Sequence, residues 1–243
     1  MPKSFSARMF VALIVISGLL VLGDAAINAK SMPTAKFALF LLVACVAARL
    51  RIKLPGVTGT MSVNLPFILV AAAEMNTAEA LAVGFISTFF QCLAKGKKFN
   101  LAQVVFNCST ITLAVAATRL IYAAPSAASM VSAPSLRLAV AAAGYALANT
   151  IPVAIVIGLT EPVSILRTWL EMLQFSFPYL VASAGIAGLT LTVTQEIGWQ
   201  VPLAVLPIMV GIFQSYRRYF TATSEAANMR LEPNNRATAG ASA

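Results

Sequence analysis

The residues of this chain with the greatest capacity for chemistry are side-chain amides and phenols that interrupt long apolar segments. Amides and hydroxyls are costly in hydrocarbon unless they hydrogen-bond, so such side chains turn towards neighbouring helices. Counted along the segments at about 1.5 Å per residue, the amides fall at similar depth, each nearer the cytoplasm. We predict a polar pocket for a small ligand; hydrogen bonding between helices is the alternative. The predicted ligand-binding residues are Asn64, Gln91, Asn107, Asn149, Gln174, Tyr145 and Tyr179.

The sequence offers little for catalysis or metal binding. Histidine is absent from the 243 residues, which removes the commonest general base and the commonest metal ligand. Cys45, Cys92 and Cys108 lie in apolar runs without CxxC spacing, so we expect them to pack as small side chains. We predict no enzyme activity, no catalytic residue, no metal and no cofactor. An enzymatic alternative would depend on Glu171, which we expect to pair with Arg167 one helical turn earlier.

Composition predicts that the bilayer is the main partner of the chain. Hydrophobic residues make up 59% of the sequence and charged residues 10%, against about a quarter charged in soluble proteins. The formal net charge is +9, but the basic residues stand between apolar runs. Such residues set membrane topology, so we expect no nucleic-acid partner.

The polar residues are carried by eight apolar segments. We predict an all-α, polytopic bundle of six to eight transmembrane helices, because crossing the hydrocarbon core takes about 20 residues. The third and fourth segments are short and form either a tilted hairpin or a re-entrant piece. The segments are 9–28, 36–50, 61–75, 79–94, 101–123, 136–159, 168–194 and 200–216.

The distribution of basic residues predicts that both termini are cytoplasmic. Lys and Arg resist translocation and gather in cytoplasmic segments. With the N-terminus inside, the only basic residues on the outer side are Lys30, Lys36, Arg119 and Arg137. We therefore predict a multi-pass protein of the bacterial inner membrane. A cleaved secretory signal over the first segment is the alternative.

The chain divides into a long apolar part and a short polar tail. Residues 1–220 are predicted to form one transmembrane domain, and residues 221–243 a disordered cytoplasmic tail, because that tail is polar and has no apolar stripe. The small-residue pairs Gly144/Ala148 and Ala184/Gly188 indicate close helix contacts. These contacts lie either within the chain or between copies of a homo-oligomer.

Six short motifs occur in a fixed order along the chain. They are Leu54-Pro55-Gly56, Gly59-Thr60-Met61-Ser62, Gln103-Val104-Val105-Phe106-Asn107, Ala148-Asn149-Thr150, Phe177-Pro178-Tyr179 and Ser215-Tyr216-Arg217-Arg218-Tyr219. In this order they resemble the membrane-associated sensor domains that precede bacterial GGDEF and HD-GYP cyclic-di-GMP enzymes. The resemblance covers about residues 36–220 and implies a sensing or scaffolding domain that acts on a cytoplasmic signalling partner. The chain departs from that family because no GGDEF loop or HD histidines follow.

Three features of the sequence carry a second, looser resemblance: the glycine-containing turn at 55–60, the short third segment and the polar residues within helices. Together they resemble the substrate-binding subunits of energy-coupling-factor vitamin transporters. That resemblance implies a six-helix subunit that works with a separate coupling subunit. We therefore expect a non-enzymatic membrane sensor or scaffold, with a metabolite transporter subunit as the alternative.

Overall fold

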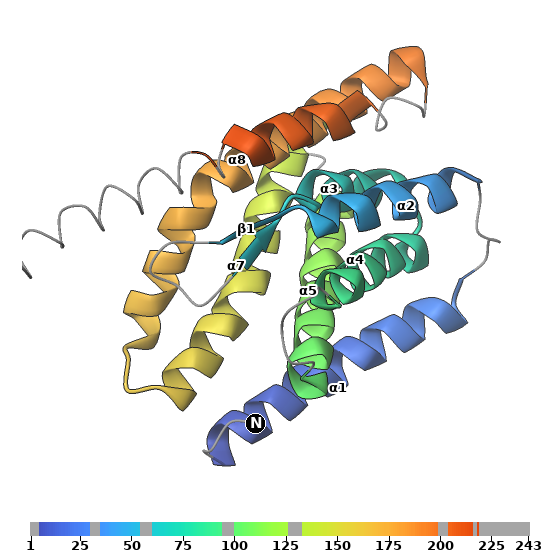
Figure 1. The fold of residues 1–243 in the computed structure, drawn as a ribbon. Helices are drawn as coiled ribbons and strands as arrows, with labels where there is room; N and C mark the ends of the chain where they lie inside the picture. Colours follow the sequence, from blue (N-terminus) through green and yellow to red (C-terminus); the bar gives the residue numbers. More distant parts are fainter. Residues whose placement is uncertain are drawn as a thin grey trace, which may run out of the picture.

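The computed structural model describes residues 5–29, 35–53, 60–93, 100–125, 133–198, 204–215 and 218. Within these residues the chain forms eight helices and one short β-hairpin (Figure 1). The prediction of an all-α bundle of six to eight helices is confirmed, and each predicted apolar segment contains one helix. The helices are α1 (Phe5–Ile27), α2 (Ala35–Arg49), α3 (Leu65–Glu74), α4 (Thr77–Cys92), α5 (Leu101–Ala123), α7 (Pro134–Thr160), α8 (Ile165–Ile197) and a last helix over Ala204–Ser215.

The helices differ in whether they can cross a bilayer. Among the described residues, α1, α5, α7 and α8 are long and apolar enough to do so, which makes this a membrane protein. α3 has 10 residues and is therefore about 15 Å long, half of the roughly 30 Å hydrocarbon core. α4 has 16 residues, or about 24 Å. The short third segment is thus a half-length helix.

A β-hairpin precedes α3, and the sequence did not predict it. β1 (Arg51–Lys53) pairs antiparallel with β2 (Thr60–Ser62), and the Val63 N–H extends the pairing by donating to the Leu50 carbonyl oxygen at 3.2 Å. The predicted helical segment from residue 61 is therefore wrong at its start, because these residues take part in strand pairing and the helix begins at Leu65. The turn at residues 54–59 lies outside the described residues, as does the predicted tail at 221–243.

The centre of the molecule is α3. All its residues from Leu65 to Ala72 are buried, and it packs against α8, α5, α4 and α2 (Figure 1). A helix that is apolar on every face is typical of a buried position. The hydrophobic core therefore surrounds α3 and takes in residues of α2, α4, α5, α7 and α8.

The outer surfaces of the long helices are apolar. Leu20 on α1, Leu120 on α5 and Leu189 on α8 are among the large exposed hydrophobic side chains, as expected where lipid is the solvent. α1 is closely held to α5 at Gly18, where an added Cβ would lie 2.6 Å from the Cβ of Ser109. This spacing explains why α1 needs a glycine at that contact.

Charged side chains fix the α3–α4 turn to its neighbours. The Nζ of Lys36, at the start of α2, lies 2.6 Å from the Oε2 of Glu74. Arg119 of α5 donates from Nη1 to the Ala72 carbonyl oxygen at 2.8 Å and from Nε to the Thr77 hydroxyl at 3.0 Å. Lys36 and Arg119 were predicted to lie on the same side of the membrane, and both contact the α3–α4 turn.

Helix ends follow local sequence signals. α4 begins with a capping box, in which the Asn76 Oδ1 accepts from the Glu79 N–H at 2.9 Å and the Glu79 Oε2 accepts from the Asn76 N–H at 3.3 Å. Such reciprocal bonds satisfy donors that have no partner within the helix. α8 ends at Gly198, whose φ of 110° is a conformation that favours glycine.

α7 and α8 form an antiparallel hairpin. Gly158 faces Ile165 at its closed end, and Gly188 lies against Ser135 at the other, where an added Cβ would be 3.3 Å from the serine Cβ. The predicted close contacts at Gly144 and Gly188 are both made within the chain, since Gly144 faces Ile121 of α5. These positions therefore pack the bundle itself.

Candidate functional site

A small group of polar side chains lies inside the apolar core at the start of α3. Asn64, Ser87, Tyr145 and Tyr179 come from four separate parts of the chain, and each is at most 6% exposed. We call these four residues the central polar cluster. Asn64, Tyr145 and Tyr179 were predicted as site residues, whereas Ser87 was not.

Asn64 connects the start of α3 to α4. Its Nδ2 donates to the Ser87 hydroxyl at 3.1 Å, and that hydroxyl donates to the Gly84 carbonyl oxygen at 3.3 Å. An asparagine before a helix usually caps that helix with its own side chain. Asn64 makes no such cap bond, so its amide serves to join two helices.

Tyr179 of α8 accepts a hydrogen bond from the first residue of α3. The Leu65 N–H donates to the Tyr179 hydroxyl oxygen at 3.2 Å. The first N–H groups of a helix have no partner within it and are costly to bury unpaired. A side chain of α8 satisfies one of them, so the position of α3 depends on α8.

The two tyrosines lie near the middles of α7 and α8. Tyr145 follows Arg137 by eight residues and Tyr179 follows Glu171 by eight, which is about 12 Å along each helix. Because α7 and α8 are antiparallel, the charged residues lie on opposite sides of the tyrosines, about 24 Å apart. Tyr145 lies 15 residues before the end of α7 at Thr160, and Tyr179 lies 14 residues after the start of α8 at Ile165, so the two tyrosines lie at the same level of the hairpin. The bond from the Leu65 N–H to Tyr179 places the start of α3 at that level, and α3 ends at the charged turn.

The five predicted amides are not all turned into the bundle. Asn64 is the only one of the five that is buried. Gln174 is exposed, so the prediction that it faces the bundle is wrong. Gln91, Asn107 and Asn149 are partly buried, and the Asn107 Nδ2 lies 3.9 Å from the Cys92 Sγ. Residue counting places an amide along the membrane normal but leaves its direction around the helix open.

Several buried hydroxyls were not predicted from the sequence. The Ser87–Thr88 pair within an apolar helix was a signal that hydroxyls lie inside the bundle. The hydroxyls of Thr88, Ser109, Thr110 and Ser183 are buried and have no hydrogen-bond partner among the described residues. Other buried hydroxyls donate to the carbonyl oxygen four residues earlier, as those of Thr112, Thr118 and Thr150 do.

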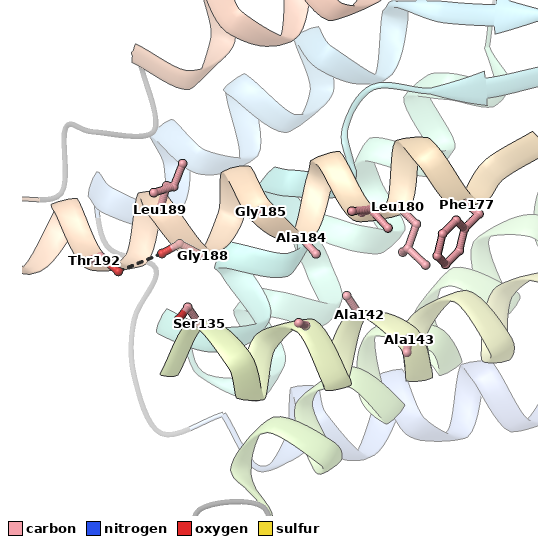
Figure 2. A pocket seen from close by; sticks show the side chains of 12 residues that line it. Ser135, Ala142, Ala143, Phe177, Leu180, Ala184, Gly185, Gly188, Leu189 and Thr192 are labelled. Atoms are coloured by element: carbon pink, nitrogen blue, oxygen red, sulfur yellow. Dashed lines mark hydrogen bonds between the residues drawn. The ribbon is translucent and has the colours of Figure 1, made fainter. Parts of the chain in front are cut away.

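A separate apolar groove runs between α7 and α8 (Figure 2). Its volume is about 490 Å³, and small side chains on both helices leave the space that forms it. None of the seven predicted site residues lines the groove. At one end the Thr192 hydroxyl donates to the Gly188 carbonyl oxygen at 3.1 Å. The lining residues are Ser135, Ala139, Ala142, Ala143, Phe177, Leu180, Val181, Ala184, Gly185, Gly188, Leu189 and Thr192.

The charged pair predicted within α8 is present but lies at the surface. The Arg167 Nε is 2.9 Å from the Glu171 Oε1, and the two side chains are 82% and 50% exposed. In the described part of the chain, no three His, Cys, Asp or Glu side chains come together as a metal site would require.

No family model, curated protein or solved structure matches this chain. The class of protein follows from the structure itself. It is a helical membrane protein built around a half-length helix, with a neutral polar cluster where that helix begins.

Proposed function

We propose that this chain is a non-enzymatic sensor domain of the bacterial inner membrane, with both termini in the cytoplasm. The observation that carries the proposal is the capping of α3 by Tyr179 of α8 at 3.2 Å inside an apolar core. A polar junction between two helices is costly in hydrocarbon unless every group is paired. A ligand that exchanges these bonds for its own changes how α3 and α8 fit together.

The chemistry of the cluster favours a small, uncharged, polar ligand. Asn64, Ser87, Tyr145 and Tyr179 supply amide and hydroxyl groups, which both donate and accept hydrogen bonds. No ionised side chain belongs to the cluster. Gln91, Asn107 and Asn149 remain predicted ligand contacts at its margin.

The signal would leave through α8. The last helix, Ala204–Ser215, follows α8 and packs Met209 and Val205 into the same core. A shift of α8 against α3 therefore reaches the segment that leads to the predicted cytoplasmic partner. This coupling requires two arrangements of the α3–α8 contact.

Native mass spectrometry of the gently purified protein tests the proposal. We expect a retained small compound, lost when Tyr179→Phe or Asn64→Ala removes a polar group of the cluster. Gln174→Leu is the matched control, because Gln174 is exposed, and it should keep the compound. A natural protein that never retains a compound, under any extraction condition, contradicts ligand sensing.

The groove between α7 and α8 favours a second candidate, a substrate-binding subunit of a metabolite transporter. Its Ala- and Gly-rich walls are typical of surfaces that pack closely against another helix, such as one from a coupling subunit. Gly185 is open, because no atom beyond its chain neighbours and its own helix backbone lies within 4 Å of an added Cβ. Under this candidate Gly185→Leu abolishes association with the coupling subunit, whereas under the sensor proposal it leaves output unchanged.

A further inference from the structure

The groove between α7 and α8 opens on the surface of two helices that are long and apolar enough to span a bilayer (Figure 2). Phe177, Val181 and Leu189 line it from α8 and are 55%, 54% and 68% exposed. None of the described residues that line the groove is charged. The groove therefore faces hydrocarbon, and an apolar group has to fill it, because atoms that line an empty space lose van der Waals contacts.

The dimensions of the groove distinguish between possible occupants. Along α8 it runs from Phe177 to Thr192, 15 residues later, which is about 22 Å. Its volume of about 490 Å³, spread over that length, corresponds to a mean width of about 5 Å. A helix with its side chains is about 10–12 Å across. Nonbonded carbon atoms pack about 3.5–4.0 Å apart, so the groove has the width of a single hydrocarbon chain.

The opening of the groove is small for a protein partner. A strip of 22 by 5 Å covers about 110 Å², whereas each partner of a stable protein interface buries about 800 Å². A second copy of this chain, or a helix of another subunit, would make most of its contacts outside the groove. A linear acyl chain needs only the groove itself, because one leaflet of the hydrocarbon core is about 15 Å deep.

The two ends of the groove differ in polarity. Ser135 and Thr192 place hydroxyl groups at one end, and Phe177 lies at the other. The hydroxyl end lies in the first turn of α7. Arg137 follows Ser135 by two residues and Glu196 follows Thr192 by four, as expected near a membrane boundary, because ionised groups are costly deeper in the bilayer. A phospholipid has the same order of polarity, with its headgroup and esters at the boundary and its chains inside.

We propose that the groove between α7 and α8 binds one acyl chain of a phospholipid, whose ester and headgroup lie at Ser135 and Thr192. Van der Waals contacts with the small side chains of both helices hold the chain in place. The proposal goes beyond the sensor function, because no residue of the central polar cluster lines the groove. It competes with the transporter candidate, which places a helix in the same groove.

Native mass spectrometry tests the proposal on full-length protein transferred into detergent from nanodiscs of phosphatidylglycerol and phosphatidylethanolamine. We expect the natural chain to retain one phospholipid. Gly185→Leu and Ala143→Leu each place a larger side chain in the groove, one from α8 and one from α7, and each should lose the lipid. The matched control is Gly23→Leu, which adds the same side chain to an open, exposed glycine of α1 and should keep the lipid.

The other outcomes overturn the proposal. They are a natural chain without a phospholipid, equal retention by the natural chain and both groove variants, and loss of the lipid from Gly23→Leu. A dimer or a second protein that Gly185→Leu removes would show that the occupant is a protein. Tyr179→Phe should keep the phospholipid, so that loss of a small compound from the central polar cluster and loss of the lipid are separate results.

Discussion

The two ends of α3 are held to neighbouring helices by different kinds of hydrogen bond. The end at the turn meets the membrane boundary, where Lys36, Glu74 and Arg119 remain near water and form charged bonds. The other end is bonded by the neutral side chains of Asn64, Ser87 and Tyr179. The two ends of α3 therefore differ in the kind of bond that holds them to neighbouring helices.

The largest effect is expected at the charged end. Arg119→Leu leaves the Ala72 carbonyl oxygen and the Thr77 hydroxyl without this donor, and should lower the free energy of unfolding by about 1.5 kcal/mol, near the top of the range for interhelical bonds. Detergent-titration unfolding measures it. Arg137→Leu, which removes a guanidinium 5.2 Å from the Tyr122 ring, is the matched control and should cost less. An Arg119→Leu cost no greater than that of Tyr179→Phe breaks the comparison.

Asn64→Ala tests the link between α3 and α4. Loss of the amide removes the bond to Ser87, so we expect about 1 kcal/mol of destabilisation, measured by thermal unfolding in the same lipid mixture. Asn149→Ala truncates a partly buried amide outside the cluster and should cost less. Equal losses would mean that the cluster has no special place among the amides.

Tyr179→Phe should have a smaller effect on stability, about 0.6 kcal/mol, because the ring and its packing remain. The substitution should act locally. Amide hydrogen exchange should become faster at the start of α3 and stay unchanged at the α3–α4 turn. Hydrogen exchange of peptides that cover each end separates the two. Faster exchange at Ala72–Glu74 would contradict the assignment of Tyr179 to the start of α3.

Gln174→Leu should change the free energy of unfolding by less than about 0.5 kcal/mol, as is usual for surface positions. The side chain is exposed on α8 five residues before Tyr179. A loss comparable to that of Asn64→Ala, seen in parallel unfolding curves, would show that the amide layer predicted from sequence operates after all.

The sequence predicted the fold better than the site. Segment bounds such as 101–123 match α5 because apolar length is a direct signal of a membrane helix. The β-hairpin was missed because a strand of three residues, such as Thr60–Ser62, carries too little periodicity to recognise.

The site was only partly predictable for a different reason. Depth follows from residue number, and it correctly brought Asn64 to the level of Tyr145 and Tyr179. The direction of a side chain around its helix depends on which neighbours that helix has, which a single sequence does not specify. The prediction for Gln174 was wrong for this reason. Ser87 was missed because the position of α4 beside the start of α3 does not follow from the sequence.

Distance measurement between spin labels in nanodiscs tests the difference between the two ends most directly. In a chain with its three cysteines replaced, Phe89→Cys on α4 and Phe177→Cys on α8, both exposed, report the start of α3. Ala78→Cys and Leu189→Cys report the turn. We predict that Tyr179→Phe broadens or shifts the first distance, because the start of α3 loses its bond to α8, and that it leaves the second distance unchanged. A first distance that does not respond to Tyr179→Phe, or an equal response of both distances, would contradict the attachment of α3 to α8 through Tyr179.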